Sequence, residues 1–349
     1  MDFTPTEEQE AARDLAARIF GDLATHERLA AAGTGSDPEL WKALCAAGLP
    51  GAVEETGLLG LVLLLEEQGR RTAQVPLAAT CVYGILAVAR HGTEEQRARL
   101  LPGLRDGTAV TTGAFPATGG VVAHEGRLSG AVPWVPWLRD ATHVLVADAE
   151  HGLWLVRTED AAGTGTVELT APWSAGRLVL DGTTAERLGP DPGAGAGSGA
   201  YADVLAAARV AFAGLQAGVC AGSLARAVEY TSVREQFGRP LSTHQAVQLR
   251  AADAHMDIEA IRVTAYEAAW RHDEGLDAGE AALTAAWWAS EAGKRVVHTG
   301  QHLHGGMGAD LDHPVHRHFL WGRQLDAYLG CGTELLAELG DLLAKGDPS

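Results

Sequence analysis

Long helical stretches in the C-terminal part of the chain limit its fold more than any other feature. Apolar residues recur there with helical periodicity in four stretches, each longer than the roughly 8–20 residues of a typical globular helix. The four stretches are residues 201–233, 243–274, 278–302 and 315–344. Because such long helices bury their apolar faces by packing along one another, we expect a C-terminal four-helix bundle within residues 201–349.

The residue pattern changes twice along the chain before this bundle. Residues 1–107 have a helical pattern with Gly or Pro at the helix borders, and Thr4 or Thr6 can cap the first helix. Residues 108–188 contain short β-branched or aliphatic segments separated by Gly, Asp and Pro, which is typical of an antiparallel β-domain, either barrel-like or a sandwich. Residues 189–200 are rich in Gly and Pro and indicate a flexible linker. The sequence therefore predicts an α+β protein: a helical N-terminal domain, an antiparallel β middle domain and a C-terminal four-helix bundle.

Charge and cysteine content exclude several classes of partner. The formal net charge of −18 repels nucleic acid and anionic membranes, so we expect neither as a partner. The N-terminal segment is acidic, unlike a signal peptide, and the longest apolar run, residues 57–65, is too short to span a bilayer. The cysteines stand in apolar surroundings without C-x-x-C spacing, which favours reduced thiols in a cytoplasmic protein over a disulfide framework or a zinc site. They are Cys45, Cys81, Cys220 and Cys331.

Two short motifs in the bundle region carry residue types suited to a dinucleotide. In residues 234–247, the guanidinium of Arg234 can pair with a pyrophosphate, and the ring of Phe237 offers a flat apolar face to an adenine. In residues 301–308, adjacent glycines let the backbone approach a phosphate or ribose closely. Taken singly, each motif also fits a plain structural role, in which Arg234 ends a helix and the glycines break one.

Both motifs resemble signatures of the acyl-CoA dehydrogenase family. Residues 234–247 are similar to the family's R-x-Q-F-G-x-P-[IL]-x-x-x-Q and residues 301–308 to its Q-x-x-G-G-x-G, and weaker similarity runs through nearly the whole chain in the right order. The resemblance implies the same helix–strand–helix fold, an acyl thioester substrate and FAD as the cofactor. It also implies that six residues contact an FAD bound mainly by a neighbouring subunit: Arg234, Phe237, Gln245, Gln301, Gly305 and Gly306.

The carboxylate that removes the substrate α-proton in this family is missing from the sequence. Members place that glutamate either in a turn after the second motif or at the start of the long helix that leads into the first motif. Aligned without gaps, these positions hold Leu329 and Ala208, and neither side chain can take a proton. The arginine beside the helix position matches Arg209, which the resemblance implies as a substrate-binding residue.

The stretch of the β-domain that contacts flavin in the family also lacks most of the family's motif residues. The family's T-E-P-x-x-G-S-D corresponds to residues 111–120, where only Pro116 and a glycine are recognisable. Together with the missing base, this resembles the non-catalytic subunit of heteromeric acyl-CoA dehydrogenases of the actinobacterial type. We therefore expect a homo- or hetero-oligomer with a sister acyl-CoA dehydrogenase subunit, in which this chain completes the partner's FAD site.

Three alternatives remain open on the sequence alone. Another carboxylate could serve as the base, with Asp203, Asp326 and Glu334 nearest to the expected positions, although helix carboxylates are mostly solvated surface groups. The chain could be a flavoenzyme of altered chemistry that acts on a carrier-bound acyl group. It could also be a structural homologue that binds no flavin.

Six histidines fall within residues 298–318 and raise the question of a metal. His298 and His302 have the i, i+4 spacing of ligands on one helix face, but no H-E-x-x-H motif accompanies them. We expect this cluster, with Arg317 and Arg323, to form a basic surface for phosphates, and no metal site.

Two tryptophan pairs are further candidates. Trp134 and Trp137 could flank a flavin or an acyl group, or simply pack. Trp287 and Trp288 stand among alanines in a helix and are expected in the core or at a subunit interface.

Overall fold

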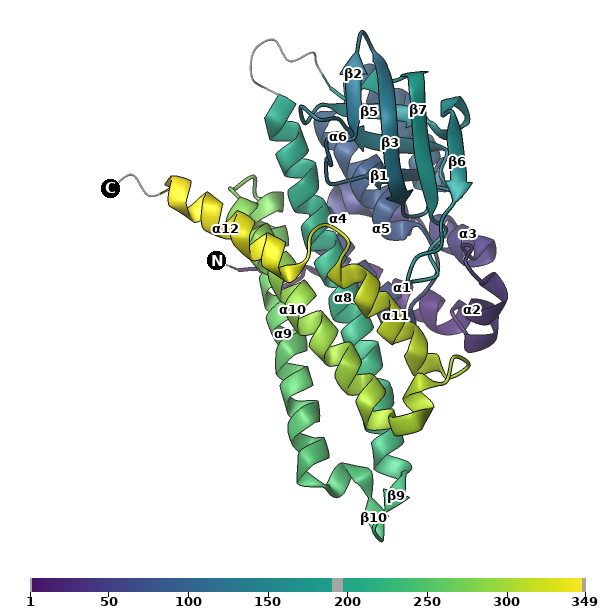
Figure 1. Cartoon of the computed structure of the whole chain (residues 1–349), viewed down its shortest axis with the longest axis vertical. Helices are drawn as coiled ribbons and strands as arrows, with labels where there is room; N and C mark the ends of the chain where they lie inside the picture. Colours follow the sequence, from purple (N-terminus) through teal and green to yellow (C-terminus); the bar gives the residue numbers. More distant parts are fainter. Residues whose placement is uncertain (1, 190–196, 347–349) are drawn as a thin grey trace. The chain divides into compact units, whose positions relative to one another are not determined.

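The order of structure along the chain is helices, then strands, then helices, in a computed structural model that describes residues 2–189 and 197–346 (Figure 1). This order confirms the expected α+β architecture. By compactness the chain divides into two units, which we call the bundle unit and the mixed unit. The bundle unit consists of residues 1–26, 62–73 and 209–349, and the mixed unit of residues 27–61 and 74–208.

The helices of the mixed unit begin and end at local signals in the sequence. Asp37 caps α3 (Pro38–Ala46) by accepting from two backbone N–H groups of its first turn. Thr93 and Gln96 form a reciprocal capping box at the start of α7 (Glu94–Asp106), and Gly107 ends that helix with a φ of 77°. The other helical segments are α2 (His26–Ala32), the first part of α4 (Leu49–Arg71), α5 (Leu77–Ala79), the π-helix η1 (Thr80–Leu86) and α6 (Ala87–His91).

Two four-stranded sheets form the β-part of the mixed unit, with strand orders β1–β4–β5–β8 and β2–β3–β7–β6. The strands are β1 (Thr111–Ala114), β2 (Val121–His124), β3 (Arg127–Val135), β4 (His143–Ala147), β5 (Leu153–Arg157), β6 (Gly163–Thr166), β7 (Gly176–Thr184) and β8 (Glu186–Arg187), with a short 3-10 turn, η2 (Thr158–Asp160), after β5. The expectation of a purely antiparallel domain is wrong for one pair, because β1 and β4 run parallel. The cause is topological: the chain leaves β1 to form β2 and β3 in the other sheet and returns in the same direction as β4.

Apolar side chains from both sheets share one core, so the β-part is a sandwich, one of the two forms expected. The buried residues of this core are Ala114, Val121, Leu128, Val135, Leu138, Val144, Val146, Trp154, Val156, Leu178 and Leu180. Residues on β7 alternate between this core and solvent, which is the pattern of a strand with one buried face.

The bundle unit is built on long helices that pack along α10. α1 (Glu7–Leu23) begins with a capping box in which Thr6, and not Thr4, is the cap. α9 (Gln245–Asp273), α11 and α12 all pack against α10 (Gly279–His304), and α8 (Gly197–Val233) contributes its residues from 209 onward to this unit. The remaining short elements are β9 (Glu235–Gln236), β10 (Arg239–Pro240), η3 (Leu241–Thr243) and η4 (Gly305–Ala309).

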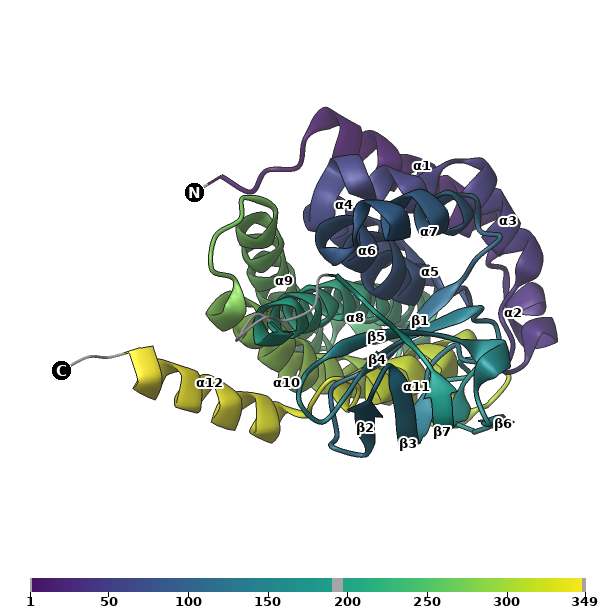
Figure 2. The ribbon, with the colours of Figure 1, turned by 90° about the horizontal axis from the view of Figure 1, so that it is seen from above.

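The single helix expected over residues 315–344 is instead two helices, α11 (Pro314–Asp326) and α12 (Gly332–Gly346). The chain turns between them at Gly330, whose φ of 111° suits glycine and opposes a helix. Leucines continue at near-helical spacing through the turn, so the apolar pattern does not reveal the break. In Figures 1 and 2, α12 (yellow) projects from the other helices of its unit, and it leaves Leu336, Leu342 and Leu343 exposed.

Glycine brings the second part of α4 into close contact with α8 in the bundle unit. A Cβ atom at Gly218 would lie 2.1 Å from the carbonyl oxygen of Glu66, so no larger residue fits between these backbones. Residues Gly199–Val233 of α8 are also long and apolar enough to span a membrane, but 89% of the apolar window is buried within the structure. That degree of burial is typical of a core helix.

The four cysteines are free thiols. Cys81 and Cys220 are buried, whereas Cys45 and Cys331 are half-buried. Of the linker expected over residues 189–200, residues 190–196 lie outside the described residues, and residues 197–200 are helical as the start of α8. The expected domain borders themselves stay predictions.

Candidate functional site

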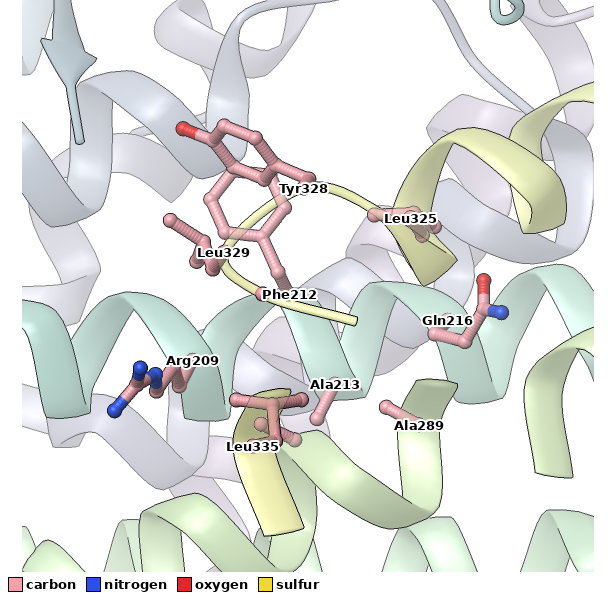
Figure 3. Close-up of a pocket in the computed structure, with 11 residues that line it drawn as sticks. Arg209, Phe212, Ala213, Gln216, Ala289, Leu325, Tyr328, Leu329 and Leu335 are labelled. Carbon is pink, nitrogen blue, oxygen red and sulfur yellow. The ribbon is translucent and has the colours of Figure 1, made fainter. Parts of the chain in front are cut away.

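A small cavity in the bundle unit is lined by Leu329, which stands at one expected base position, and by Arg209, which follows Ala208 at the other (Figure 3). Leu329 lines it from the turn between α11 and α12, and Arg209, the residue after Ala208, lines it from α8. We call it the base-site cavity; its lining residues are Arg209, Phe212, Ala213, Gln216, Ala286, Ala289, Leu325, Tyr328, Leu329, Gly330 and Leu335. Leu329 and Arg209 therefore line the same cavity.

Mostly apolar side chains line the base-site cavity, with Arg209 and Gln216 as polar members. Leu329 is 6% exposed, and the ring of Phe212 meets the ring of Tyr328 edge-on with centroids 4.7 Å apart. The space that remains is about 20 Å³, room for little more than one water molecule. No carboxylate is among its lining residues, and Ala208 is fully buried. The described residues thus offer no group in this cavity that could remove a carbon-bound proton.

Arg209, expected to contact substrate, is held by an ion pair. Its Nη1 and Nη2 atoms donate to Oε1 and Oε2 of Glu338 on α12 at 2.8 and 2.6 Å. The Arg209 side chain is 8% exposed, whereas that of Glu338 is 50% exposed. This bidentate geometry is the strongest form of an arginine–carboxylate contact, and it fixes the guanidinium at the edge of the base-site cavity.

The three carboxylates considered as replacement bases are all engaged in other contacts. Asp326 accepts from Ser290 Oγ at 2.5 Å and pairs with Arg323 at 3.1 Å. Glu334 accepts from a backbone N–H at the start of α12, which holds its pKa below the usual value. Asp203, in the mixed unit, lies 2.7 Å from His91 Nε2. None of the three lines the base-site cavity.

The first motif forms an exposed hairpin at the end of α8. β9 and β10 pair through Arg239 and Gln236, and in Figure 1 the hairpin forms the lower tip of the bundle unit. Arg234 follows directly after α8 and is exposed. The Phe237 side chain is 88% exposed, at a φ of 54°, so a large apolar ring is presented outward from a tight turn.

The second motif ends α10. Gly305 has a φ of 61° and, like Gly306, is exposed with no atom within 4 Å of a Cβ placed on it, so the backbone there is open to approach. Gln301 is half-buried and its amide donates to the carbonyl oxygen of Gly308 at 3.1 Å, which holds the turn. Gln245 is exposed at the first position of α9.

Tyr230 contacts both motifs, although it belongs to neither. Its ring stacks on that of His304, the last residue of α10, with centroids 4.9 Å apart. Its carbonyl oxygen accepts from Arg234 N at 2.9 Å. The one available signal was its position in the last turn of α8, four residues before Arg234. We call Arg234, Phe237, Gln245, Gly305 and Gly306 the hairpin–turn surface.

In residues 111–120, where the family's flavin-contacting motif is expected, polar groups form hydrogen bonds within the protein. Within residues 111–120, Thr112 Oγ1 donates to a backbone carbonyl at 2.5 Å, and Ala117 N donates to Tyr201 Oη at 3.1 Å. Phe115 is buried and stacks on Tyr201 with ring centroids 5.6 Å apart. The hydroxyl of Thr112 and the amide of Ala117 therefore bond within the protein. In the family, groups of this kind in this stretch contact the flavin.

Several histidines of residues 298–318 pack against neighbouring rings or backbone groups, and His304 and His313 contact each other with ring centroids 5.0 Å apart. His318 is fully buried between the carbonyl oxygens of Pro314 and Arg70, and burial lowers its pKa to about 4. His298 packs edge-on against Phe319. Among residues 2–189 and 197–346, no group of three or more His, Cys, Asp or Glu side chains is placed to hold a metal ion.

The tryptophans mostly pack. Trp137 is fully buried and stacks on Trp173 with centroids 4.6 Å apart, whereas Trp134 is half-buried. Trp287 and Trp288 meet edge-on, and Trp287 packs against the small core formed by Leu283, Ala286 and Leu335.

The fold and the two motifs define a class of flavin-dependent dehydrogenase, and comparison with known proteins identifies it. Residues 6–108 match the family model described as acyl-CoA dehydrogenase, N-terminal domain, and residues 195–338 match that described as acyl-CoA dehydrogenase, C-terminal domain. The chain belongs to the acyl-CoA dehydrogenase family, a family of oxidoreductases whose cofactor is FAD.

Individual relatives extend over the whole chain. Acyl-CoA dehydrogenase FadE27 of Mycobacterium tuberculosis is 34% identical over 99% of both chains. A solved variant of the Tcur3481-Tcur3483 steroid ACAD is 43% identical, with a TM-score of 0.91 over 98% of this chain and 99% of that chain. A chain of the ChsE4-ChsE5 complex from Mycobacterium tuberculosis is 31% identical, with a TM-score of 0.91 over 100% of both chains.

Proposed function

We propose that this chain is the non-catalytic subunit of a heteromeric acyl-CoA dehydrogenase and completes the FAD site of a catalytic sister subunit. The reaction of the assembly is α,β-dehydrogenation of an acyl thioester, and the sister subunit supplies the base. The observation that carries the proposal is the base-site cavity: no carboxylate lines it, Leu329 stands at one expected base position, and the remaining space is about 20 Å³. An acyl chain and a carboxylate cannot share that space.

The hairpin–turn surface supports the second half of the proposal, because its residues fit an FAD presented by another chain. FAD supplies the hydride acceptor when it is bound. Arg234 offers a permanently charged fork for the pyrophosphate, Phe237 an aromatic face for the adenine, and the backbone of Gly305 and Gly306 a close approach. All four are exposed in this chain, as residues must be if they complete a site on a partner.

The β-domain fits its own flavin poorly. The amide of Ala117 and the hydroxyl of Thr112 already have partners inside the mixed unit. This supports an arrangement in which the ring-binding half of the FAD site comes from the sister subunit. The similarity to the two-protein ChsE4-ChsE5 complex favours a heteromer over a homo-oligomer. Free thiols at all four cysteines suit the reducing cytoplasm.

Purification of the chain alone and with a co-expressed catalytic sister subunit tests this function. We expect the chain alone to carry little FAD and to leave added acyl-CoA unchanged, and the complex to bind FAD and reduce it on addition of acyl-CoA. Arg234→Gln should lower the FAD content of the complex, whereas Arg250→Gln, at an exposed arginine on α9, should not. Stoichiometric FAD and family-like turnover in the chain alone would contradict the proposal.

A further inference from the structure

A second cavity, in the mixed unit, lies apart from the residues considered above. It measures about 500 Å³, within the roughly 300–1,000 Å³ typical of small-molecule sites. α7 forms one wall, and strands β4, β5, β7 and β8 with their connections form the other. We call it the α7–sheet cavity; its lining residues are Arg99, Leu100, Gly103, Ala109, His143, Leu155, Arg157, Asp160, Thr184, Ala185 and Glu186.

The walls of the α7–sheet cavity are mainly apolar, with basic groups on both: Arg99 on α7, and His143 and Arg157 on the strands. Leu100 comes from α7 and Leu155 from β5, and Ala109 and Ala185 add small apolar surface. An apolar cavity with a few convergent polar groups is the usual form of a site that orients a small organic ligand.

His143 and Arg157 are direct cross-strand partners in the antiparallel pair of β4 and β5. Directly opposite residues have Cβ atoms about 4.5–5.5 Å apart, and two basic side chains in that arrangement oppose each other unless an anion lies between them. Burial, then Arg157, then Arg99 lower the pKa of His143, and their effect exceeds that of nearby Glu186, which raises it. The electrostatic potential at the imidazole is therefore positive.

The nearby carboxylates, Glu186 and Glu159, do not supply the anion expected between His143 and Arg157. Glu186 accepts from Arg99 Nη2 on one oxygen and from Gln96 Nε2 on the other, so its charge is already compensated. Arg157 pairs with Glu159, but both side chains are 63% exposed, and a solvated pair of this kind is weak and easily exchanged. His143 Nδ1 lies 2.9 Å from Thr142 Oγ1, and Nε2 has no hydrogen-bond partner among the described residues.

We propose that the α7–sheet cavity binds a small monocarboxylate with an apolar body. The carboxylate lies between Arg157 and His143 Nε2, and the apolar body packs against Leu100 and Leu155. The ligand is a free acid and not a CoA thioester, because one guanidinium and one imidazole match one carboxylate rather than a nucleotide with several phosphates. This site is independent of the proposed FAD role, since none of its residues belongs to the hairpin–turn surface.

Isothermal titration of the full chain with octanoate tests the proposal, with 1-octanol as the neutral probe of the same length. We expect saturable octanoate binding and at least tenfold weaker binding of 1-octanol. Arg157→Gln should weaken octanoate binding at least tenfold. Arg177→Gln, at an exposed arginine on β7 outside the cavity, is the matched control and should bind as the wild type does. Ala109→Phe, which fills the cavity, should abolish binding.

The pH dependence gives a readout that a purely structural arginine would not change. A carboxylate beside His143 favours the imidazolium, so octanoate should bind more tightly at pH 6 than at pH 8 and take up protons on binding. The charged groups lining the cavity beside His143 are Arg99 on α7, Arg157 on β5, Asp160 in η2 and Glu186 on β8. His143→Asn should remove the pH dependence. No saturable octanoate binding, equal binding by Arg157→Gln, or equal affinity for 1-octanol would each overturn the proposal.

Discussion

Replacing Glu338 with glutamine tests whether the ion pair with Arg209 stabilises the closed base site. Both terminal nitrogens of Arg209 bond to Glu338, and Arg209 Nε has no hydrogen-bond partner within the described structure. Removing one member of a fully buried pair costs about 3–5 kcal/mol, because the remaining charge is uncompensated. Here Arg209 is 8% exposed but Glu338 is 50% exposed, so water screens the guanidinium partly. We therefore expect Glu338→Gln to lower the free energy of unfolding by about 1.5–2.5 kcal/mol.

The assay is urea denaturation followed by circular dichroism, with a double-mutant cycle. Asp341→Asn, at an exposed carboxylate on the same helix, is the control and should change stability by less than about 0.5 kcal/mol. Arg209→Leu removes the guanidinium, and once it is gone Glu338→Gln should have little further effect, a coupling of at least about 1 kcal/mol. A Glu338→Gln protein as stable as Asp341→Asn would refute the assigned role of the pair.

Three further predictions concern packing, pH and the exposed surface. Gly218→Val should cost more than about 3 kcal/mol in chemical denaturation, because its Cβ would meet the Glu66 carbonyl oxygen at 2.1 Å, whereas Gly340→Ala, with no atom within 4 Å, should not destabilise the protein. The folded-state pKa of His318, about 4, lies below the ordinary value, so the unfolded state takes up the proton first. Stability should therefore fall as pH drops from about 6.5 to 4, by up to about 3 kcal/mol, and His318→Gln should flatten that slope in denaturation curves measured across the range. Phe237→Ala should leave the unfolding midpoint of the free chain unchanged, since the ring is 88% exposed. It should weaken FAD retention in the complex about tenfold, measured by flavin release on dilution. Equal retention by the variant and the wild type would show that Phe237 does not contact the FAD.

Local signals in the sequence predicted the helix borders well, because caps depend on residues three or four positions apart. Thr6 is an example, and the motif around Arg234 and Phe237 was equally evident in the sequence. The break between α11 and α12 was missed, although Gly330 marked it, because the leucine pattern continues across the turn. Local strand patterns also could not show that β1 pairs with β4 in parallel, since that depends on which sheet takes the intervening strands.

The sequence could not predict which residues far apart in the chain contact each other. Nothing near Arg209 indicates that its partner is Glu338, on a helix whose start was itself misplaced. The stack of Tyr230 on His304 and the opposition of His143 to Arg157 likewise depend on how separate elements meet. By contrast, the prediction that Ala208 and Leu329 stand where the family places its base required the motif spacing alone and no knowledge of packing, and it stays a prediction.

If the chain is the non-catalytic subunit proposed above, the filling of the base-site cavity makes a loss of the carboxylate hard to reverse in evolution. Had Leu329 been the sole change, a single substitution to glutamate could return an ancestral activity. With Phe212 and Tyr328 in contact across the space and about 20 Å³ left, that substitution alone would leave no room for a substrate. On the proposed function, a lineage in this condition needs several coordinated replacements before any one of them is useful, and association with another subunit would be what keeps the chain under selection.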